Sequence, residues 1–111
     1  MSAELPILNM SKEQPGASGT FVHLIPDIKS RDAPFDASVF IVEPGCCSKE
    51  DRHEVTELWI LTQGEGVLYY SDQEYVVRAP CALMFTPNQP HRILNKGNNR
   101  MLINSIWWKA E

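Results

Sequence analysis

Short runs rich in β-branched and aromatic residues recur along this chain, and Gly, Pro, Asn and Asp separate them. Runs of this length that are punctuated by turn residues are typical of β-strands, whereas the periodicity of an amphipathic helix is missing from the sequence. Many short, closely spaced strands are characteristic of a sandwich or a barrel. The sequence therefore predicts an all-β fold with strands at residues 20–25, 38–42, 56–62, 66–71, 74–78, 82–86, 91–95 and 101–107.

The length of 111 residues suits one hydrophobic core and leaves no room for a separate cofactor-binding domain. We expect a single domain over residues 1–111, in which residues 1–19 form an N-terminal arm and surface connection and residues 20–108 form the barrel. The polar segments 9–19 and 26–34 are predicted to be surface connections, and residues 71–73 and 96–99 to be hairpin loops.

Charge and cysteine content exclude several classes of protein. The chain carries 14 acidic and 10 basic side chains, for a net charge of -4, so nucleic acid is not an expected partner. No membrane segment and no export signal are recognisable, which predicts a cytoplasmic protein that does not bind membranes. We expect Cys46, Cys47 and Cys81 to be reduced, because their odd number and spacing suit neither a disulfide framework nor a zinc finger.

Side chains capable of binding a metal concentrate in two stretches. Asp51, His53 and Glu57 lie in the first, and His91 lies in the second. Alternate residues of an extended strand share a face, so Asp51 and His53 are expected to point the same way, and a barrel can bring His91 to the same point. Two imidazoles with one or two carboxylates suit a divalent first-row metal.

These residues give the chain a resemblance to the cupin superfamily of small jelly-roll barrels, also called double-stranded β-helices. The first cupin motif, G-x5-H-x-H-x3,4-E-x6-G, is similar to residues 45–64, with Asp51 in place of the first His. The second, G-x5-P-x-G-x2-H-x3-N, resembles residues 80–95, where His91 and Asn95 match while the Gly and Pro positions do not.

The resemblance implies a metal site with His53, Glu57 and His91 as ligands and Asp51 as a possible fourth ligand. If Asp51 coordinates, two carboxylates favour Mn or Fe; if it does not, a 2-His-1-carboxylate face is left with open positions. A third alternative is that the metal is lost and these groups act as acid and base. The expected cofactor is a divalent ion, namely Fe, Mn, Ni or Zn.

Three functions remain open at this point. A metal-dependent enzyme of the isomerase, lyase, dehydratase or cyclase type, acting on a small polar organic molecule, is preferred, with Asp51, His53 and Glu57 taking part in catalysis. A dioxygenase and a cupin that binds a small ligand without turnover are the alternatives. Cupins commonly pair, so the resemblance also implies a homodimer.

Other polar residues near the motifs are assigned simpler roles. His23 is expected at the surface or hydrogen-bonded in the core, and Cys47 is expected to be a small buried residue, although it shares strand parity with Asp51. Glu50 and Glu54 have the opposite parity and are predicted to face solvent. Asn95 is expected to set the geometry of the adjacent turn.

Overall fold

The computed structural model describes residues 5–109 of the chain. These residues form short antiparallel strands and one single-turn helix, α1 (Asp27–Ser30), which confirms the all-β prediction. In chain order the strands are β1 (Gln14–Pro15), β2 (Thr20–Leu24), β3 (Asp36–Val42), β4 (Thr56–Gln63), β5 (Glu65–Tyr70), β6 (Gln73–Arg78), β7 (Cys81–Phe85), β8 (His91–Asn95) and β9 (Met101–Trp108). Within residues 5–109, no helix is long and apolar enough to cross a membrane.

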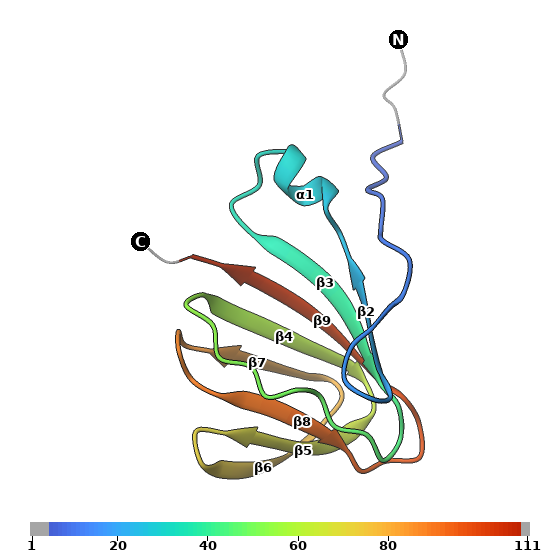
Figure 1. The fold of residues 1–111 in the computed structure, drawn as a ribbon, viewed down its shortest axis with the longest axis vertical. Helices are drawn as coiled ribbons and strands as arrows, with labels where there is room; N and C mark the ends of the chain where they lie inside the picture. The colour runs from blue at the N-terminus through green and yellow to red at the C-terminus, as the bar shows by residue number, and fades with distance from the viewer. Residues whose placement is uncertain (1–4, 110–111) are drawn as a thin grey trace.

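The strands form two sheets that pack face to face as a jelly-roll barrel. One sheet has the order β1-β2-β3-β9-β4-β7, and the smaller one has the order β6-β5-β8 (Figure 1). Neighbouring strands in each sheet are antiparallel. Strands that are distant in sequence, such as β4 and β9, are thereby placed side by side.

The core lies between the two sheets and follows the alternation of side chains along each strand. On β4, Glu57, Trp59 and Leu61 are buried, and on β8 His91 and Ile93 are buried in the same alternating way. Their neighbours along each strand are more exposed. The apolar members of these rows therefore form the core, while Glu57 and His91 are inward-facing polar residues at one end of it.

Two elements lie in segments that the sequence assigns to surface connections. Strand β1 is only two residues long and owes its existence to pairing with β2, which a local pattern cannot reveal. Helix α1 is one turn with a single buried side chain, Ile28, and is too short to show helical periodicity. The predicted strands otherwise match the observed ones to within two residues at each end.

A glycine at the end of the first motif is required by its surroundings. Gly64 has φ +103° and lies between β4 and β5, where a Cβ atom would come within 2.8 Å of Met101 Cγ. Side chains of L-residues rarely adopt this conformation, and Met101 is fully buried. This motif position therefore has a structural role in turning the chain from one sheet to the other.

Candidate metal centre

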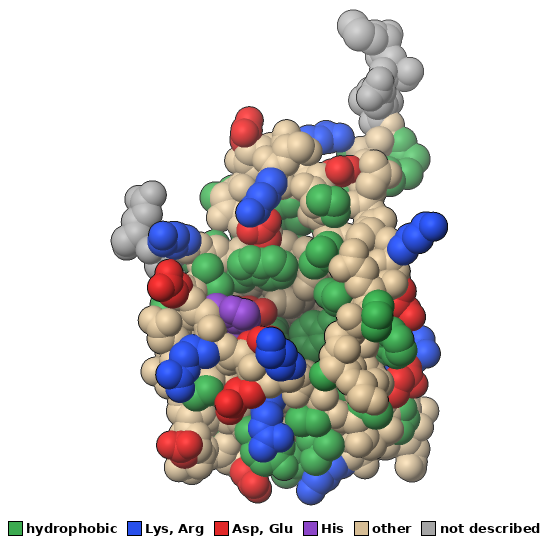
Figure 2. Space-filling view, in the orientation of Figure 1, with side chains coloured by type: hydrophobic (Ala, Val, Ile, Leu, Met, Phe, Trp, Pro, Cys, Tyr) green, Lys and Arg blue, Asp and Glu red, His purple; other side chains and the backbone are tan. Residues whose placement is uncertain are grey.

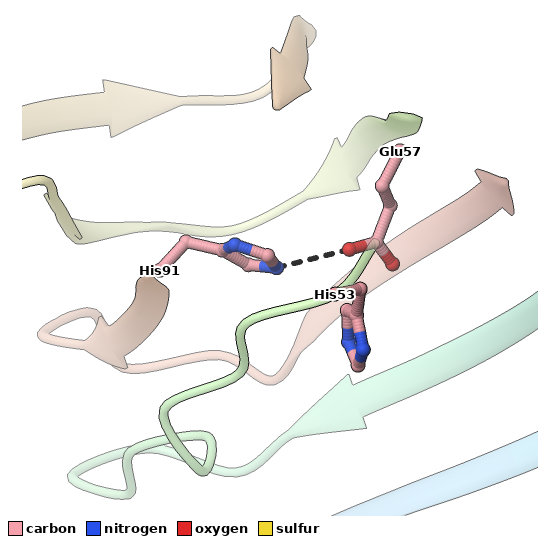
Figure 3. Close-up of side chains that lie close together, drawn as sticks. All are labelled: His53, Glu57 and His91. Atoms are coloured by element: carbon pink, nitrogen blue, oxygen red, sulfur yellow. Dashed lines mark hydrogen bonds and ion pairs between the residues drawn. The ribbon is translucent and has the colours of Figure 1, made fainter. Parts of the chain in front are cut away.

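Donor atoms of His53, Glu57 and His91 lie within 4.8 Å of one another at one end of the barrel (Figure 3). Glu57 projects inward from β4 in the larger sheet, and His91 is the first residue of β8 in the smaller sheet. His53 belongs to the segment that leads into β4. The three side chains therefore come from both sheets and from the connection between β3 and β4.

The segment that carries His53 is held in place by backbone pairing with β8. Isolated bridges join Cys47 to Leu94 and Asp51 to His91. The backbone N–H of Asp51 donates to the carbonyl of His91 over 2.9 Å, and the N–H of His91 donates back to the carbonyl of Asp51 over 2.9 Å. This pairing places His53, two residues further on, near the side chain of His91, at 5.9 Å between ring centroids.

Both nitrogens of His91 face oxygen acceptors. Nε2 lies 2.9 Å from Oε1 of Glu57, and Nδ1 lies 2.9 Å from the carbonyl oxygen of Gln89. The ring is 3 % exposed and stacks on Phe85 with 4.2 Å between centroids, so its orientation is fixed. With acceptors at both nitrogens, the imidazole satisfies its surroundings best when both nitrogens carry protons.

Burial by itself raises the pKa of the Glu57 carboxyl, but hydrogen bonds outweigh it and leave this pKa below its ordinary value. The donors are His91, the Ser105 hydroxyl, whose Oγ lies 2.5 Å from Oε2, and the Trp59 indole. The Trp59 N–H points to this carboxyl and lowers its pKa, but its buried nitrogen lies outside strict hydrogen-bond geometry. Burial alone lowers the pKa of His91, whereas the bonds to Glu57 and Gln89 raise it above its ordinary value.

These opposite shifts predict how the stability of metal-free protein depends on pH. The lowered pKa of Glu57 stabilises the fold above its unfolded value of 4.5, and this contribution is lost as pH falls through the folded pKa. The raised pKa of His91 stabilises the fold below 6.5, and that contribution is lost as pH rises through the folded pKa. Urea unfolding of EDTA-treated protein should therefore show a loss of stability from pH 6 to pH 9 that is smaller in Glu57→Gln.

Glu54→Gln is the control for this pH experiment, because Glu54 is an exposed carboxylate three residues away that forms no ion pair within the described chain. It should keep the wild-type pH dependence. An identical loss of stability between pH 6 and pH 9 in Glu57→Gln and wild type would contradict the assignment of the ion pair.

Asp51 lies beside this group but is not one of the three clustered donors. Its Oδ2 is 3.8 Å from Nε2 of His53, so the two side chains point the same way, as the alternation predicts. Beyond His53 the chain bends at residues 54 and 55, and the extended register does not continue to Glu57. Glu50 and Glu54 are exposed, as predicted, but Glu54 lines the same cavity as Asp51 and His53, so parity does not separate them.

The remaining candidates lie elsewhere. The Nδ1 of His23 is 3.1 Å from the carbonyl oxygen of Ser11, and its Nε2 is 3.4 Å from Oε2 of Glu13, away from the three donors. The Cys47 sulfur lies 3.5 Å from Nη1 of Arg92, and all three cysteines are unpaired. The motif analysis missed Ser105, the hydroxyl donor to Glu57, although it follows Met101 and Ile103 in the inward alternation of β9.

A cavity of about 710 Å³ opens beside His53 and Glu57. In Figure 2 it is a hollow with hydrophobic side chains at its bottom, a histidine at its side, and basic and acidic side chains around it. This volume is in the range of pockets that hold one small molecule. Asp51 also lines the cavity, so both carboxylates and His53 face the same space.

The clustered donors suit a divalent ion. Donors bound at about 2.1 Å lie about 3 Å apart when adjacent and about 4 Å apart when opposite, so small side-chain adjustments bring all three onto one ion. The Gln89 carbonyl holds Nδ1 of His91 and leaves Nε2 for the ion, and Ser105 holds the second oxygen of Glu57. Binding would replace the proton that lies between His91 and Glu57.

A jelly-roll barrel with two histidines and a glutamate converging at one end defines a class of small barrel protein with a candidate metal site. A family model described as a cupin domain matches residues 38–108, which is more than half of the chain. The chain belongs to the cupin family, which confirms the resemblance seen in the two motifs.

Solved structures share the fold. A cupin 2 conserved barrel domain protein from Salinispora arenicola is 22% identical, with a TM-score of 0.79 over 99% of this chain and 92% of that one. The polyketide cyclase RemF from Streptomyces resistomycificus is 17% identical, with a TM-score of 0.73 over 96% and 79%. A sugar phosphate isomerase of the cupin superfamily from Silicibacter pomeroyi is 16% identical, with a TM-score of 0.73 over 99% and 76%. At these identities the likeness establishes the fold alone.

Proposed function

We propose that this protein is a metal-dependent cupin enzyme that carries out a non-redox step, of the isomerase, lyase, dehydratase or cyclase type, on a small organic molecule. The observation that carries the proposal is the convergence of His53, Glu57 and His91 beside a cavity that His53 and Glu57 line and that is large enough for one such molecule. The cyclase and isomerase among the structures of the same fold are consistent with it.

His53, Glu57 and His91 would hold the ion, which supplies Lewis-acid polarisation of a substrate oxygen when bound. Asp51 is the group positioned to move a proton, because its carboxylate is partly exposed, lines the cavity and lies 3.8 Å from His53. Ser105 and the Gln89 carbonyl orient the Glu57 and His91 side chains.

The experiment combines metal analysis with a test for proton transfer. Protein purified without added metal should contain a divalent ion, and the loaded protein should exchange carbon-bound protons of α-hydroxyketones with D₂O, as followed by proton NMR. The exchange should be equal with and without oxygen. Metal-containing protein that exchanges no carbon-bound proton of any α-hydroxyketone tested would contradict the proposed chemistry.

A dioxygenase is the second candidate, and the composition of the cluster favours it. Two histidines and one glutamate without Asp51 form the 2-His-1-carboxylate set of non-haem iron oxygenases. An oxygen electrode separates the two candidates, because oxygen uptake coupled to substrate loss would support the dioxygenase and overturn the non-redox proposal.

Asp51→Asn is expected to weaken metal affinity or turnover at least about tenfold, the lower end of the effects of residues that support metal ligands. The substitution keeps the side-chain shape but removes the charge that faces His53. Chelator competition and the D₂O exchange assay measure the two quantities. Glu54→Gln is the matched control, since it removes a carboxylate at the same cavity without touching His53, and equal values in the two variants would show Asp51 to be a bystander.

A further inference from the structure

Five large apolar side chains from four neighbouring strands of the larger sheet, the sheet that also carries Glu57, line the cavity and form its apolar wall. They are Val22 and Leu24 of β2, Phe40 of β3, Trp59 of β4 and Trp107 of β9. Phe40 and Trp59 meet edge to face, with 5.0 Å between ring centroids. A wall of this kind removes the apolar surface of a bound ligand from water, and its aromatic side chains can pack edge or face against a ring of that ligand.

The same wall provides few hydrogen bonds to a ligand. Asn, Gln and Tyr are absent from the described residues that line the cavity, and the hydroxyl-bearing residues there are Thr20, Ser38, Ser48 and Ser105. Three of these hydroxyls already bond to the protein: Thr20 to the Ala17 carbonyl at 2.6 Å, Ser48 to the Ile93 N–H at 2.9 Å, and Ser105 to Glu57. Ser38 is 6 % exposed.

A sugar or another polyol would leave many of its hydroxyl groups unpaired in such a cavity, at a free-energy cost for each one. Charged side chains do offer hydrogen bonds to hydroxyl groups, but those that line the cavity before Glu57 all lie on one segment, residues 49–54, so they serve only one end of a ligand. Lys49 and Arg52 line the cavity together with Asp51 and Glu54 on the same segment, so the opposite charges balance and give no strong preference for an anion. The discriminating feature is therefore the apolar wall.

We infer that the cavity binds a molecule with an aromatic or other ring-bearing apolar body and one oxygen-bearing end, and that it discriminates against polyols. The placement of the oxygen-bearing end at His53 and Glu57 rests on the proposed function; the preference for a ring rests on the wall alone. The sequence predicts a small polar substrate, and this inference restricts it to a molecule that is polar at one end only.

The test compares 2-naphthol with glucose as probes by isothermal titration calorimetry. In EDTA-treated protein, the Kd for 2-naphthol should be at least about tenfold lower than that for glucose, equivalent to about 1.4 kcal/mol. Val22→Trp fills the cavity and should raise the Kd for 2-naphthol at least about tenfold. Leu24→Ser, which makes the wall polar without filling it, should raise this Kd severalfold.

Controls separate the cavity from general attraction to apolar surface. Val76→Trp and Met84→Ser make the same kinds of change at residues that are 80% and 59% exposed on β6 and β7, outside the cavity, and should leave the Kd for 2-naphthol within about twofold. Thermal unfolding followed by circular dichroism checks that each variant is folded.

Glucose binding as tight as 2-naphthol binding, or 2-naphthol binding that survives Val22→Trp in folded protein, would overturn the inference. Because these titrations are made on metal-free protein, they stay informative if the proposed metal chemistry fails. If the protein binds 2-naphthol but no metal, the inference about the ligand class stands and the proposed function fails.

Discussion

Replacing His91 with alanine is expected to lower divalent metal affinity at least about hundredfold, the upper end of the effects of residues that only support metal ligands. His91 is the only buried imidazole among the three clustered donors, and its ring is held by the Gln89 carbonyl and by stacking on Phe85. Its loss removes a nitrogen ligand that no described neighbour can replace, since His53 is already in the group. Competition with a chromophoric chelator measures the change.

His23→Ala is the matched control for this experiment. His23 is a partly buried histidine with its own hydrogen bond to Ser11, but it lies on β2 outside the donor group, so its removal should leave metal affinity within about twofold. His91→Phe tests the alternative of misfolding, because it keeps an aromatic ring to stack on Phe85 while removing both nitrogens. Tight metal binding by folded His91→Phe would exclude His91 as a ligand.

Asn95→Ala is expected to destabilise the protein by about 3 kcal/mol or more, because it removes three hydrogen bonds, one of them to the carbonyl of the buried Val42. Asn95 is fully buried at the end of β8. Its Nδ2 donates to the carbonyls of Val42 and Asn99 over 2.8 and 2.9 Å, and its Oδ1 accepts from the N–H of Gly97 over 2.9 Å. The side chain thereby ties the turn after β8 to the end of β3.

Urea unfolding measures this change as a shift in midpoint at constant slope. Asn98→Ala provides the comparison, since Asn98 is exposed in the same turn and should change the free energy of unfolding by no more than about 0.5 kcal/mol. Equal stability of the two variants would contradict the structural role of Asn95. The motif resemblance predicts this role for the turn, and the hydrogen bond to Val42 extends it to β3.

The features that could be predicted from sequence are those with a local periodic signal. Glu57, Trp59 and Leu61 alternate along β4, and His91 and Ile93 alternate along β8, so both the strands and the faces of their side chains follow from the pattern. The convergence of Glu57 and His91 from different sheets does not follow from it. That expectation came from the spacing of the two cupin motifs.

Other features depend on contacts between distant parts of the chain. Ser105 reaches Glu57 because β9 pairs with β4, across 48 residues of sequence, and no local pattern marks that partner. Asp51 and His53 point the same way, as the alternation along an extended strand predicts. The bend at residues 54 and 55 then breaks this alternation before Glu57. The apolar wall likewise arises from strands that are adjacent only in the folded sheet.

Glu57 and His91 stand on opposite sheets, and this arrangement has a kinetic consequence. An ion held by both would act as a cross-link between the two halves of the barrel, at a point that forms only after β4 and β8 have docked. Interactions that form after the rate-limiting step of folding change the rate of unfolding and leave the rate of folding almost untouched. Metal would then lengthen the lifetime of the folded barrel without speeding its assembly.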